Sequence, residues 1–339
     1  AQNEKPLFIT YQTGAQYTRG KTLEIGMAQL ETANENEDMI CAGPVYPMTD
    51  RGGHLDANGY RWYGEMLGKA YYRTKVLGQR FVPLQPIEIA RTDNAKEIKI
   101  RFLVPKLPLV LDDWTVQKKT DYGFRVYNDN AQQTITNIRI EGDCVYLTCA
   151  QDLSGVIEIN YAGDGANGGH GNLRDSDDYE AYYKYIDHDK KNPDNSYFYP
   201  RDKENDNYVT LRPDYEPKTQ SGEIIYDQPY PLYNFSVAFY YKLDKGEQNY
   251  KVPNLDDITD SAEAVQVSGA SLHQAGNSIL LKGIKTPVQV KLYSLSGSLL
   301  QIIDAPQAGL YSLNDFNKGI YIAKAVIDGN PCTLKISIR

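Results

Sequence analysis

The sequence is poor in cysteine and histidine and has no long apolar run. Its four cysteines and four histidines show no metal-ligand spacing, so we expect no metal site. Cysteine usage alone leaves the redox compartment open. No stretch approaches the roughly 20 apolar residues of a membrane-spanning helix, so we expect no membrane span. An excess of basic residues is also missing: the net charge of -8 argues against a nucleic-acid partner.

Tyrosine, in contrast, is abundant, with 28 residues against eight phenylalanines. A tyrosine ring combines a flat apolar face with a polar tip, which suits wet interfaces and sugar-like ligands. Half-buried strand positions in a β-rich protein are the alternative explanation. The tyrosine-rich run 179–241 leaves the same choice. It forms either a sugar-stacking surface or a long insert that prolines and tyrosines hold against the fold.

The first 80 residues follow the order strand, helix, strand, loop, helix. Apolar patterns predict strands over 7–12 and 39–46 and an amphipathic helix over 17–33. Asp56 is a candidate N-cap for the second helix. This order predicts part of a doubly wound, flavodoxin-like α/β domain. Because two parallel strands cannot cover their own apolar faces, residues 1–80 must pack against a downstream domain, another chain or an N-terminal part outside this sequence.

The pattern changes after residue 80 to short strands separated by Pro, Gly and Asp turns. It predicts a β-sandwich over 81–248, interrupted by an irregular Tyr-, Asp- and Asn-rich insert over 163–227. The polar stretch 249–264 is typical of a linker, and 265–339 predicts a second β-sandwich. The predicted fold class is therefore α/β plus all-β, with a partial doubly wound segment followed by two β-sandwich modules.

Asp50 and His54 are the candidate catalytic residues. They lie on either side of a glycine turn, after the second predicted strand and before the second helix. The carboxyl ends of strands are where α/β sheets build their sites. A carboxylate can hold the tautomer of an imidazole that takes a proton from a hydroxyl nucleophile. We therefore favour this catalytic interpretation over a structural histidine near a turn.

The segment YPMTDRGGHLDANGYRWYGEML resembles the C-terminal block of the SGNH/GDSL hydrolase superfamily, in its carbohydrate-esterase and sialate-acetylesterase-like branch. The resemblance covers residues 6 to 79. It implies a serine esterase with His54 as general base, oriented by Asp50, and with no metal or other cofactor. One departure is the spacing DxxxH where the family has DxxH, with Gly52 and Gly53 in the turn.

A second departure is that no GDS motif occurs, so the nucleophile serine of this family is missing from the chain. The nearest string, Gly142-Asp143-Cys144, falls inside a predicted strand. The resemblance thus implies the Asp/His part of an enzyme that removes acyl groups, such as acetyl, from polysaccharide. We expect this chain alone to be inactive. Its expected partners are an acylated polysaccharide or glycan and the N-terminal half of the hydrolase domain.

The run GDGANGGHGNLRDSDD, residues 163–178, is a second candidate constellation. Its oxygen-bearing side chains could surround a hard cation, or His170, Arg174 and Asp175 could face a substrate. A solvated loop is the alternative. GNLRDSD also resembles a recurring segment of the β-domain that follows such esterase domains. That resemblance implies a structural or cleft-lining role for Arg174 and Asp175, which are our candidate substrate-binding residues.

Residues 265–339 resemble the C-terminal sorting or anchoring domains of secreted Bacteroidetes proteins. The resemblance rests on VKLYSLSGSLLQ, GLYSLNDFNKGIYIAKAV and the final KISIR. It implies a secreted, periplasmic or cell-surface protein; a generic fibronectin-like module is the alternative. Two functions therefore stay open. One is a secreted carbohydrate esterase of which this chain is a part, and the other is a catalytically inert glycan-binding or structural surface protein.

Overall fold

The protein consists of two compact units, residues 1–256 and 257–339, each described here by itself. The computed structural model describes residues 6–14, 20–51, 54–77, 79–163, 168–196, 198, 213–255, 271–275, 278–282, 284, 286–294, 298–313, 316–327 and 330–338.

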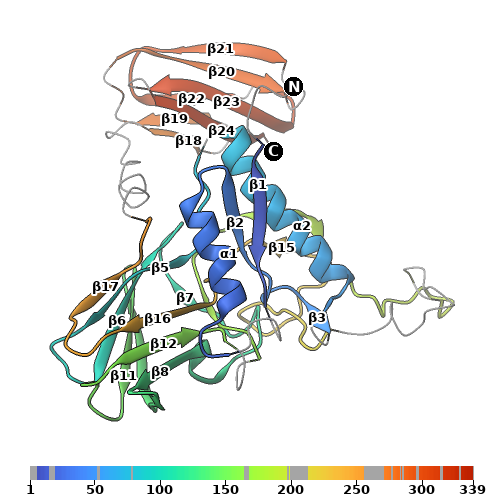
Figure 1. The fold of residues 1–339 in the computed structure, drawn as a ribbon. Helices are drawn as coiled ribbons and strands as arrows, with labels where there is room; N and C mark the ends of the chain where they lie inside the picture. The colour runs from blue at the N-terminus through green and yellow to red at the C-terminus, as the bar shows by residue number, and fades with distance from the viewer. Residues whose placement is uncertain are drawn as a thin grey trace. The chain divides into compact units, whose positions relative to one another are not determined.

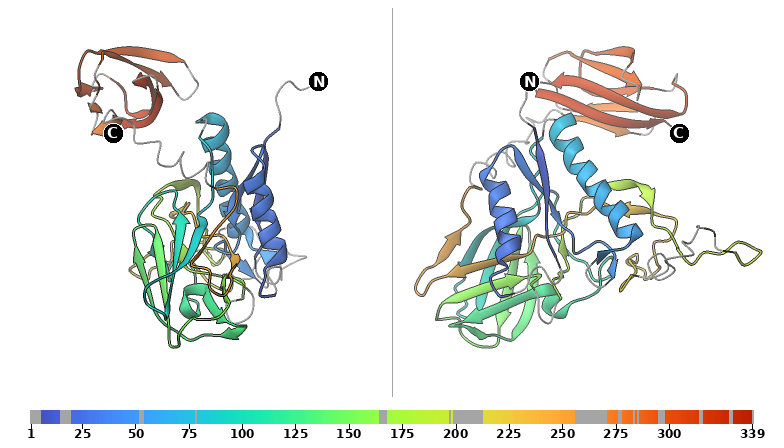
Figure 2. Two further views of the ribbon diagram at one scale, coloured as in Figure 1. Left: turned by 60° about the vertical axis from the view of Figure 1, so that its left-hand side comes forward. Right: turned by 45° about the vertical axis from the view of Figure 1, so that its right-hand side comes forward.

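The first unit begins with a parallel strand pair and two helices that lie alongside it (Figures 1 and 2). The elements are β1 (Phe8–Gln12), α1 (Glu24–Glu35), β2 (Met39–Pro44), β3 (Asp50–Arg51), β4 (His54–Leu55), α2 (Ala57–Tyr71) and η2 (Tyr72–Val76). Ile40 and Ala42 of β2 pack with Ala70 of α2 and with Phe81 in one buried apolar cluster. This packing fixes α2 against the parallel pair.

Two larger antiparallel sheets follow. The five-stranded sheet has the order β10-β11-β6-β5-β17, and the four-stranded sheet has the order β16-β12-β8-β9. Their strands are β5 (Gln85–Arg91), β6 (Glu97–Leu103), β8 (Phe124–Asn128), β9 (Ala131–Gln132), β10 (Ile135–Glu141), β11 (Cys144–Cys149), β12 (Ile157–Tyr161), β16 (Phe239–Leu243) and β17 (Asn249–Lys251). The buried rings of Phe102 in β6 and Phe239 in β16 are 6.0 Å apart, so residues of the two sheets meet in one core.

Five short elements of the described chain lie between the strands of these two sheets in the sequence. They are β7 (Val110–Leu111), η3 (Thr120–Gly123), β13 (Leu173–Arg174), β14 (Glu180–Lys184) and β15 (Pro229–Pro231). β13 pairs with β7, and β14 pairs with β15. No helix in the described part of the chain is long and apolar enough to cross a membrane.

The predicted doubly wound, flavodoxin-like α/β segment is wrong. Among the described strands the only parallel pairing is that of β1 with β2, and the remaining strands form several small antiparallel sheets. A doubly wound domain needs a larger parallel sheet with helices on both faces. The local order strand, helix, strand is present, but the strands that follow run antiparallel to their neighbours. The protein is therefore mostly β-structure with two α-helices in its described part.

The parallel pair is held directly against the antiparallel part. Gln12, at the end of β1, is fully buried; its amide donates to the carbonyl oxygens of Gly26 in α1, at 3.1 Å, and Ala238 before β16, at 2.7 Å. The backbone N–H of Ala238 donates back to Gln12 Oε1 at 2.6 Å. These bonds join β1 and α1 to the four-stranded sheet. Residues 249–251, expected in a linker, instead form β17 and extend the five-stranded sheet.

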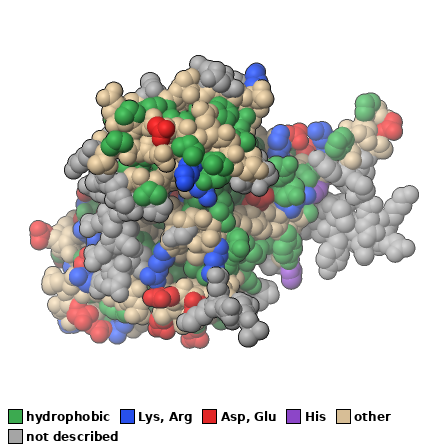
Figure 3. All heavy atoms as spheres, turned by 90° about the horizontal axis from the view of Figure 1, so that it is seen from above, with side chains coloured by type: hydrophobic (Ala, Val, Ile, Leu, Met, Phe, Trp, Pro, Cys, Tyr) green, Lys and Arg blue, Asp and Glu red, His purple; other side chains and the backbone are tan. Residues whose placement is uncertain are grey.

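The second unit contains two antiparallel sheets of its own, with the orders β18-β19-β22 and β21-β20-β23-β24. The strands are β18 (Ser271–Ala275), β19 (Ser278–Lys282), β20 (Val288–Ser294), β21 (Leu299–Ala305), β22 (Gly309–Ser312), β23 (Gly319–Ile327) and β24 (Asn330–Ile338). Its core includes Val290, Leu292 and Ile336. Apolar side chains are also visible on the surface in Figure 3, and β21 exposes Leu299, Leu300 and Ile302.

Candidate functional site

The loop that carries Asp50 and His54 is fixed to the start of α2. Asp56 is the N-cap of this helix, as the sequence predicts: its Oδ1 accepts from the Gly59 N–H at 2.6 Å. The Thr49 hydroxyl donates to the same oxygen at 2.6 Å. A Cβ on Gly59 would lie 2.1 Å from the Thr49 carbonyl oxygen, so only glycine allows this close approach. The two ends of the loop are thereby held together.

Asp50 and His54 line one cavity, which we call the tyrosine cavity. Its volume is about 190 Å³. Its wall contains four tyrosines together with the Asp50 and His54 side chains: Tyr11, Tyr46, Tyr60 and Tyr63. Tyr60 is 59% exposed, and Tyr11 and Tyr63 meet edge to face with 5.5 Å between ring centroids. Aromatic faces and hydrogen-bonding groups therefore surround the same space.

A second cavity, which we call the charged cavity, lies on the other side of Asp50. Its volume is about 140 Å³, and it is lined by Asp50, Lys119, His170 and Asp214, with Tyr46 and Tyr215 among the remaining residues. Asp50 Oδ2 lies 4.0 Å from His170 Nε2. The Asp214 backbone N–H donates to the Asp50 carbonyl oxygen at 2.9 Å. Four segments that are distant in sequence therefore meet here.

The surroundings of Asp50 favour its neutral form. Burial, followed by the charges of Asp214 and Asp56, raises the pKa of Asp50 to about 6, and Lys119 opposes this shift. Burial also lowers the pKa of Lys119, while the two carboxylates Asp50 and Asp214 act in the opposite direction. An aspartate that exchanges its proton near neutral pH is typical of functional sites, although buried structural networks produce the same shift.

Tyr46 lines both cavities and is held rigidly. Its hydroxyl donates to the Ser236 carbonyl oxygen at 2.7 Å and lies 3.2 Å from the Tyr161 hydroxyl. Its ring meets the His170 ring edge to face, with 6.0 Å between centroids. Burial, together with Tyr161, raises the pKa of Tyr46 well above its usual value, so this phenol stays neutral. The wall between the cavities is therefore built from Asp50 and an immobile aromatic ring.

The structure brings His54 and Asp50 to one cavity, but their side chains are not hydrogen-bonded to each other in the described part of the chain. His54 is exposed, and among the described residues no hydrogen bond between its imidazole and the Asp50 carboxylate is recorded. The Asp50 carboxylate instead lies near His170, with 4.0 Å between Oδ2 and Nε2. General-base catalysis by His54 stays a prediction.

Arg174 and Asp175, the candidate substrate-binding residues, lie inside the fold. Arg174 is 6% exposed, pairs with Asp112 through a short hydrogen bond, and stacks on Tyr233 with 3.8 Å from guanidinium carbon to ring centroid. Asp175 is fully buried and accepts from the Asn234 side chain at 2.7 Å. The ion pair, the ring stacking and the hydrogen bond described above are all made with other residues of the protein. A contact of either residue with substrate stays a prediction.

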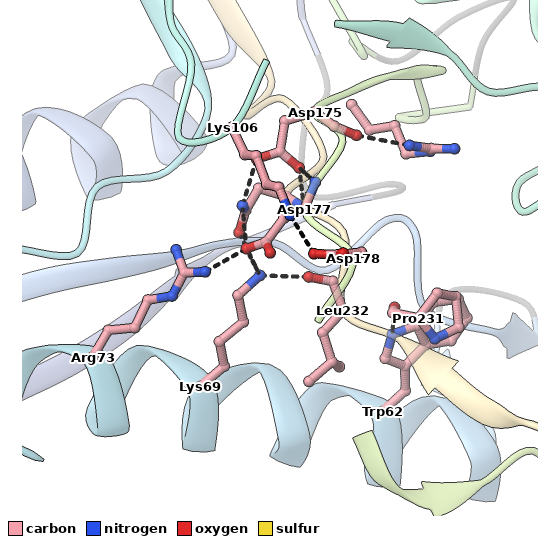
Figure 4. A network of polar contacts seen from close by, with 11 residues as sticks. Trp62, Lys69, Arg73, Lys106, Asp175, Asp177, Asp178, Pro231 and Leu232 are labelled. Carbon is pink, nitrogen blue, oxygen red and sulfur yellow. Dashed lines mark hydrogen bonds and ion pairs between the residues drawn. The ribbon is translucent and has the colours of Figure 1, made fainter. Parts of the chain in front are cut away.

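A buried ionic network, which the sequence did not lead us to predict, lies next to these residues (Figure 4). Lys69 of α2 pairs with Asp177 at 3.0 Å, and Arg73 of η2 pairs with the same carboxylate at 2.6 Å. Lys69 also donates to Asn234 Oδ1 at 2.9 Å. These contacts bind α2 to the loop after β13. The sequence signal would have been a lysine among the apolar residues of a helix.

The described residues contain no group of three or more His, Cys, Asp or Glu side chains arranged to hold a metal ion. No family model matches the sequence, and no curated protein matches it. Solved structures that resemble it include the N-terminal part of the bacterial S-layer protein SbsC, at 10% identity over 93% of this chain and 54% of that one, with a TM-score of 0.22. Another is the structure of domains 1-6 of SbsC, at 10% identity over 95% of this chain and 47% of that one, with a TM-score of 0.23.

The chain thus spans about half the length of these SbsC structures. A likeness with such low TM-scores carries no argument about the fold or the function of this protein. The assignment of function therefore depends on the site itself.

Proposed function

We propose that the protein binds glycans, and that it does so in the tyrosine cavity at the protein surface. The observation that carries this proposal is the grouping of four tyrosines around Asp50 and His54. Sugar rings offer apolar C–H faces that pack on aromatic rings, and hydroxyls that pair with carboxylates and imidazoles. Binding sites commonly combine aromatic walls with a few convergent polar groups in this way.

Exposed tyrosines elsewhere in the first unit support the same proposal. Tyr182 and Tyr183 of β14 are 87% and 56% exposed, and their rings meet edge to face at 5.4 Å. Aromatic rings in such positions leave apolar surface in water unless a ligand covers it. The predicted export through residues 265–339 would bring the protein to polysaccharide outside the cell or at its surface. Cell fractionation with antibodies against the intact chain tests this location.

Isothermal titration with neutral oligosaccharides tests glycan binding. We expect a saturable heat signal for at least one sugar and a loss of affinity of about tenfold in Tyr60→Ala, since aromatic anchors of this kind contribute about 1–2 kcal/mol. Tyr71→Ala is the matched control. Tyr71 lies on the same helix and is 52% exposed, but it does not line the cavity. If no sugar binds, or if both variants lose affinity equally, the proposal is wrong.

A second candidate function is that of an incomplete serine esterase. The observation that favours it is that Asp50 and His54 share one cavity after the carboxyl end of β2. His54 would act as the general base for a serine that this chain does not supply. The chain alone should then fail to hydrolyse p-nitrophenyl acetate. Hydrolysis by the chain alone that disappears in His54→Ala would contradict this, because it would require a nucleophile within these 339 residues.

A further inference from the structure

We propose that the charged cavity is a second saccharide subsite, so that the protein binds two adjoining sugar residues of one glycan with Asp50 between them. This inference rests on the proposed function and extends it from a single sugar to a chain segment. It assigns a role to Lys119, His170 and Asp214, which lie outside the tyrosine cavity.

Asp50 and Tyr46 line both cavities, so the two spaces are neighbours that share a wall. Their volumes are about 140 and 190 Å³. Each is much larger than the roughly 10–15 Å³ that one water needs and below the roughly 300–1,000 Å³ of sites for drug-sized ligands. Two small adjoining spaces suit consecutive rings of a chain better than one large ligand.

Asp50 and Asp214 provide hydrogen-bond acceptors in the charged cavity, while Lys119 provides donors. Because groups of both signs line the cavity, the attraction of a charged ligand to one group is offset by its repulsion from another. A neutral polyhydroxyl compound both donates and accepts, so it satisfies both kinds of group. The rings of Tyr46 and Tyr215 in the wall add apolar surface for the sugar's C–H groups.

The cavity is preorganised by hydrogen bonds to two of the segments that line it. The Lys119 backbone N–H donates to Asn172 Oδ1 at 2.9 Å, and the Tyr215 hydroxyl donates to the Trp114 carbonyl oxygen at 2.8 Å. Asn172 is fully buried. These hydrogen bonds hold the segments that carry Lys119 and Tyr215 in place. A ligand entering it pays little ordering cost, which favours affinity.

Titrations with sugars of increasing length test the second subsite. The full-length protein is titrated with xylose, xylobiose and xylotetraose, and with the corresponding glucose series. We expect the disaccharide of the series that binds to do so at least tenfold more tightly than its monosaccharide. Asp214→Asn should reduce this ratio several-fold. Lys119→Met should do the same, because the first variant replaces a charged acceptor with a neutral amide and the second removes the ammonium donor.

Lys118→Met is the matched control for Lys119→Met. Lys118 is the preceding residue and pairs with Asp113 at 3.0 Å, but it does not line the cavity. This variant should keep the wild-type ratio. Circular dichroism and thermal unfolding of each variant show whether its fold is intact, and Lys119→Gln serves as a second variant if Lys119→Met is unfolded.

The outcomes separate the two proposals. If no saccharide of either series binds, both the glycan-binding function and the second subsite are wrong. If a monosaccharide binds and the longer sugars gain nothing, the second subsite alone is wrong. The same holds if the gain with length survives in both Asp214→Asn and Lys119→Met.

Discussion

The Asp50 carboxylate lies 4.0 Å from the His170 imidazole, Oδ2 to Nε2. The two residues are distant in sequence: Asp50 lies in β3, and His170 lies in the loop between β12 and β13. The sequence predicts a different partner for Asp50, its near neighbour His54. Asp50 lines the tyrosine cavity with His54 and the charged cavity with His170, which is the basis of the two-subsite proposal.

Replacing Asp50 should change stability in a pH-dependent way. Its folded-state pKa of about 6 exceeds the roughly 3.9 of an unfolded aspartate, so the folded protein holds this proton more tightly. The resulting stability is fully present below about pH 4 and is lost as the pH rises through about 6. Asp50→Asn should therefore stabilise the protein at pH 7.5, by about 1 kcal/mol after allowance for solvent screening, and change little at pH 4.

Thermal unfolding of wild type and Asp50→Asn at both pH values measures this effect. An equal shift in the unfolding midpoint at pH 4 and pH 7.5 would contradict a raised pKa. Asp178→Asn provides a comparison of opposite sign: its hydrogen bond with Lys106 lowers the pKa of this 86% exposed carboxylate, so its replacement should not stabilise the protein at pH 7.5.

Removing Asp177 should be strongly destabilising. Lys69 is 3% exposed, and its loss of this counter-ion would leave a buried charge that burial already disfavours. We expect Asp177→Asn to lower the free energy of unfolding by about 3–5 kcal/mol, measured by urea denaturation. The exposed pair Lys106–Asp178 in Figure 4 is the matched comparison. Asp178→Asn should cost less than about 1 kcal/mol, and similar losses in the two variants would argue against a special role for the buried pair.

Alanine substitutions at three glycines of α2 should have different effects on stability: Gly59→Ala should destabilise the protein, whereas Gly64→Ala and Gly68→Ala should stabilise it. At Gly59 a Cβ would come within 2.1 Å of the Thr49 carbonyl oxygen, so Gly59→Ala must displace the Asp50 loop. A Cβ on Gly64 or Gly68 would meet nothing within 4 Å. Alanine there should stabilise the helix by about 0.5–1 kcal/mol. Urea denaturation should thus rank Gly59→Ala lowest, and its sugar affinity should also fall; equal stabilities would mean that the loop adapts freely.

Arg174→Lys separates a structural role from a substrate-binding one. Lysine keeps the charge but loses the planar group that stacks on Tyr233 and pairs with Asp112. We expect a loss of stability of about 2 kcal/mol with unchanged sugar affinity in the folded protein, measured by urea denaturation and calorimetry. Lower affinity at unchanged stability would instead support the sequence-based expectation that Arg174 contacts substrate.

Local patterns allowed part of this structure to be predicted from the sequence. The cap at Asp56 and the order of the first strands and helices follow from side-chain chemistry and periodicity within a few residues. The fold class does not, because it depends on which strands pair. The first 80 residues have an α/β order, yet their parallel pair is completed by antiparallel strands through contacts such as Gln12 with Ala238.

The site was predictable to a similar extent. Asp50 and His54 were singled out from a local motif and do line one cavity, whereas the tyrosines beside them were not predicted, since the expected tyrosine surface was 179–241. The charged cavity depends on loops that only the folded chain assembles, so Lys119 and Asp214 carry no local signal. Arg174 and Asp175 show how burial can differ from what a local sequence pattern suggests. A Gly-, Asn- and Asp-rich run suggests a solvated or ligand-facing loop, whereas both side chains are buried with partners from distant segments.

The pairing of β17 with β5 has a consequence for how this protein could vary. The chain enters its antiparallel part on β5 and returns on the adjacent strand, where Tyr250 lies opposite Ile89. Neighbouring strands are only about 4.8 Å apart, so the excursion between them begins and ends at nearly the same place. Loops within it can therefore lengthen, shorten or be exchanged between related genes while the points of entry and exit stay fixed. Diversification of ligand preference would then require no rearrangement of the scaffold on either side.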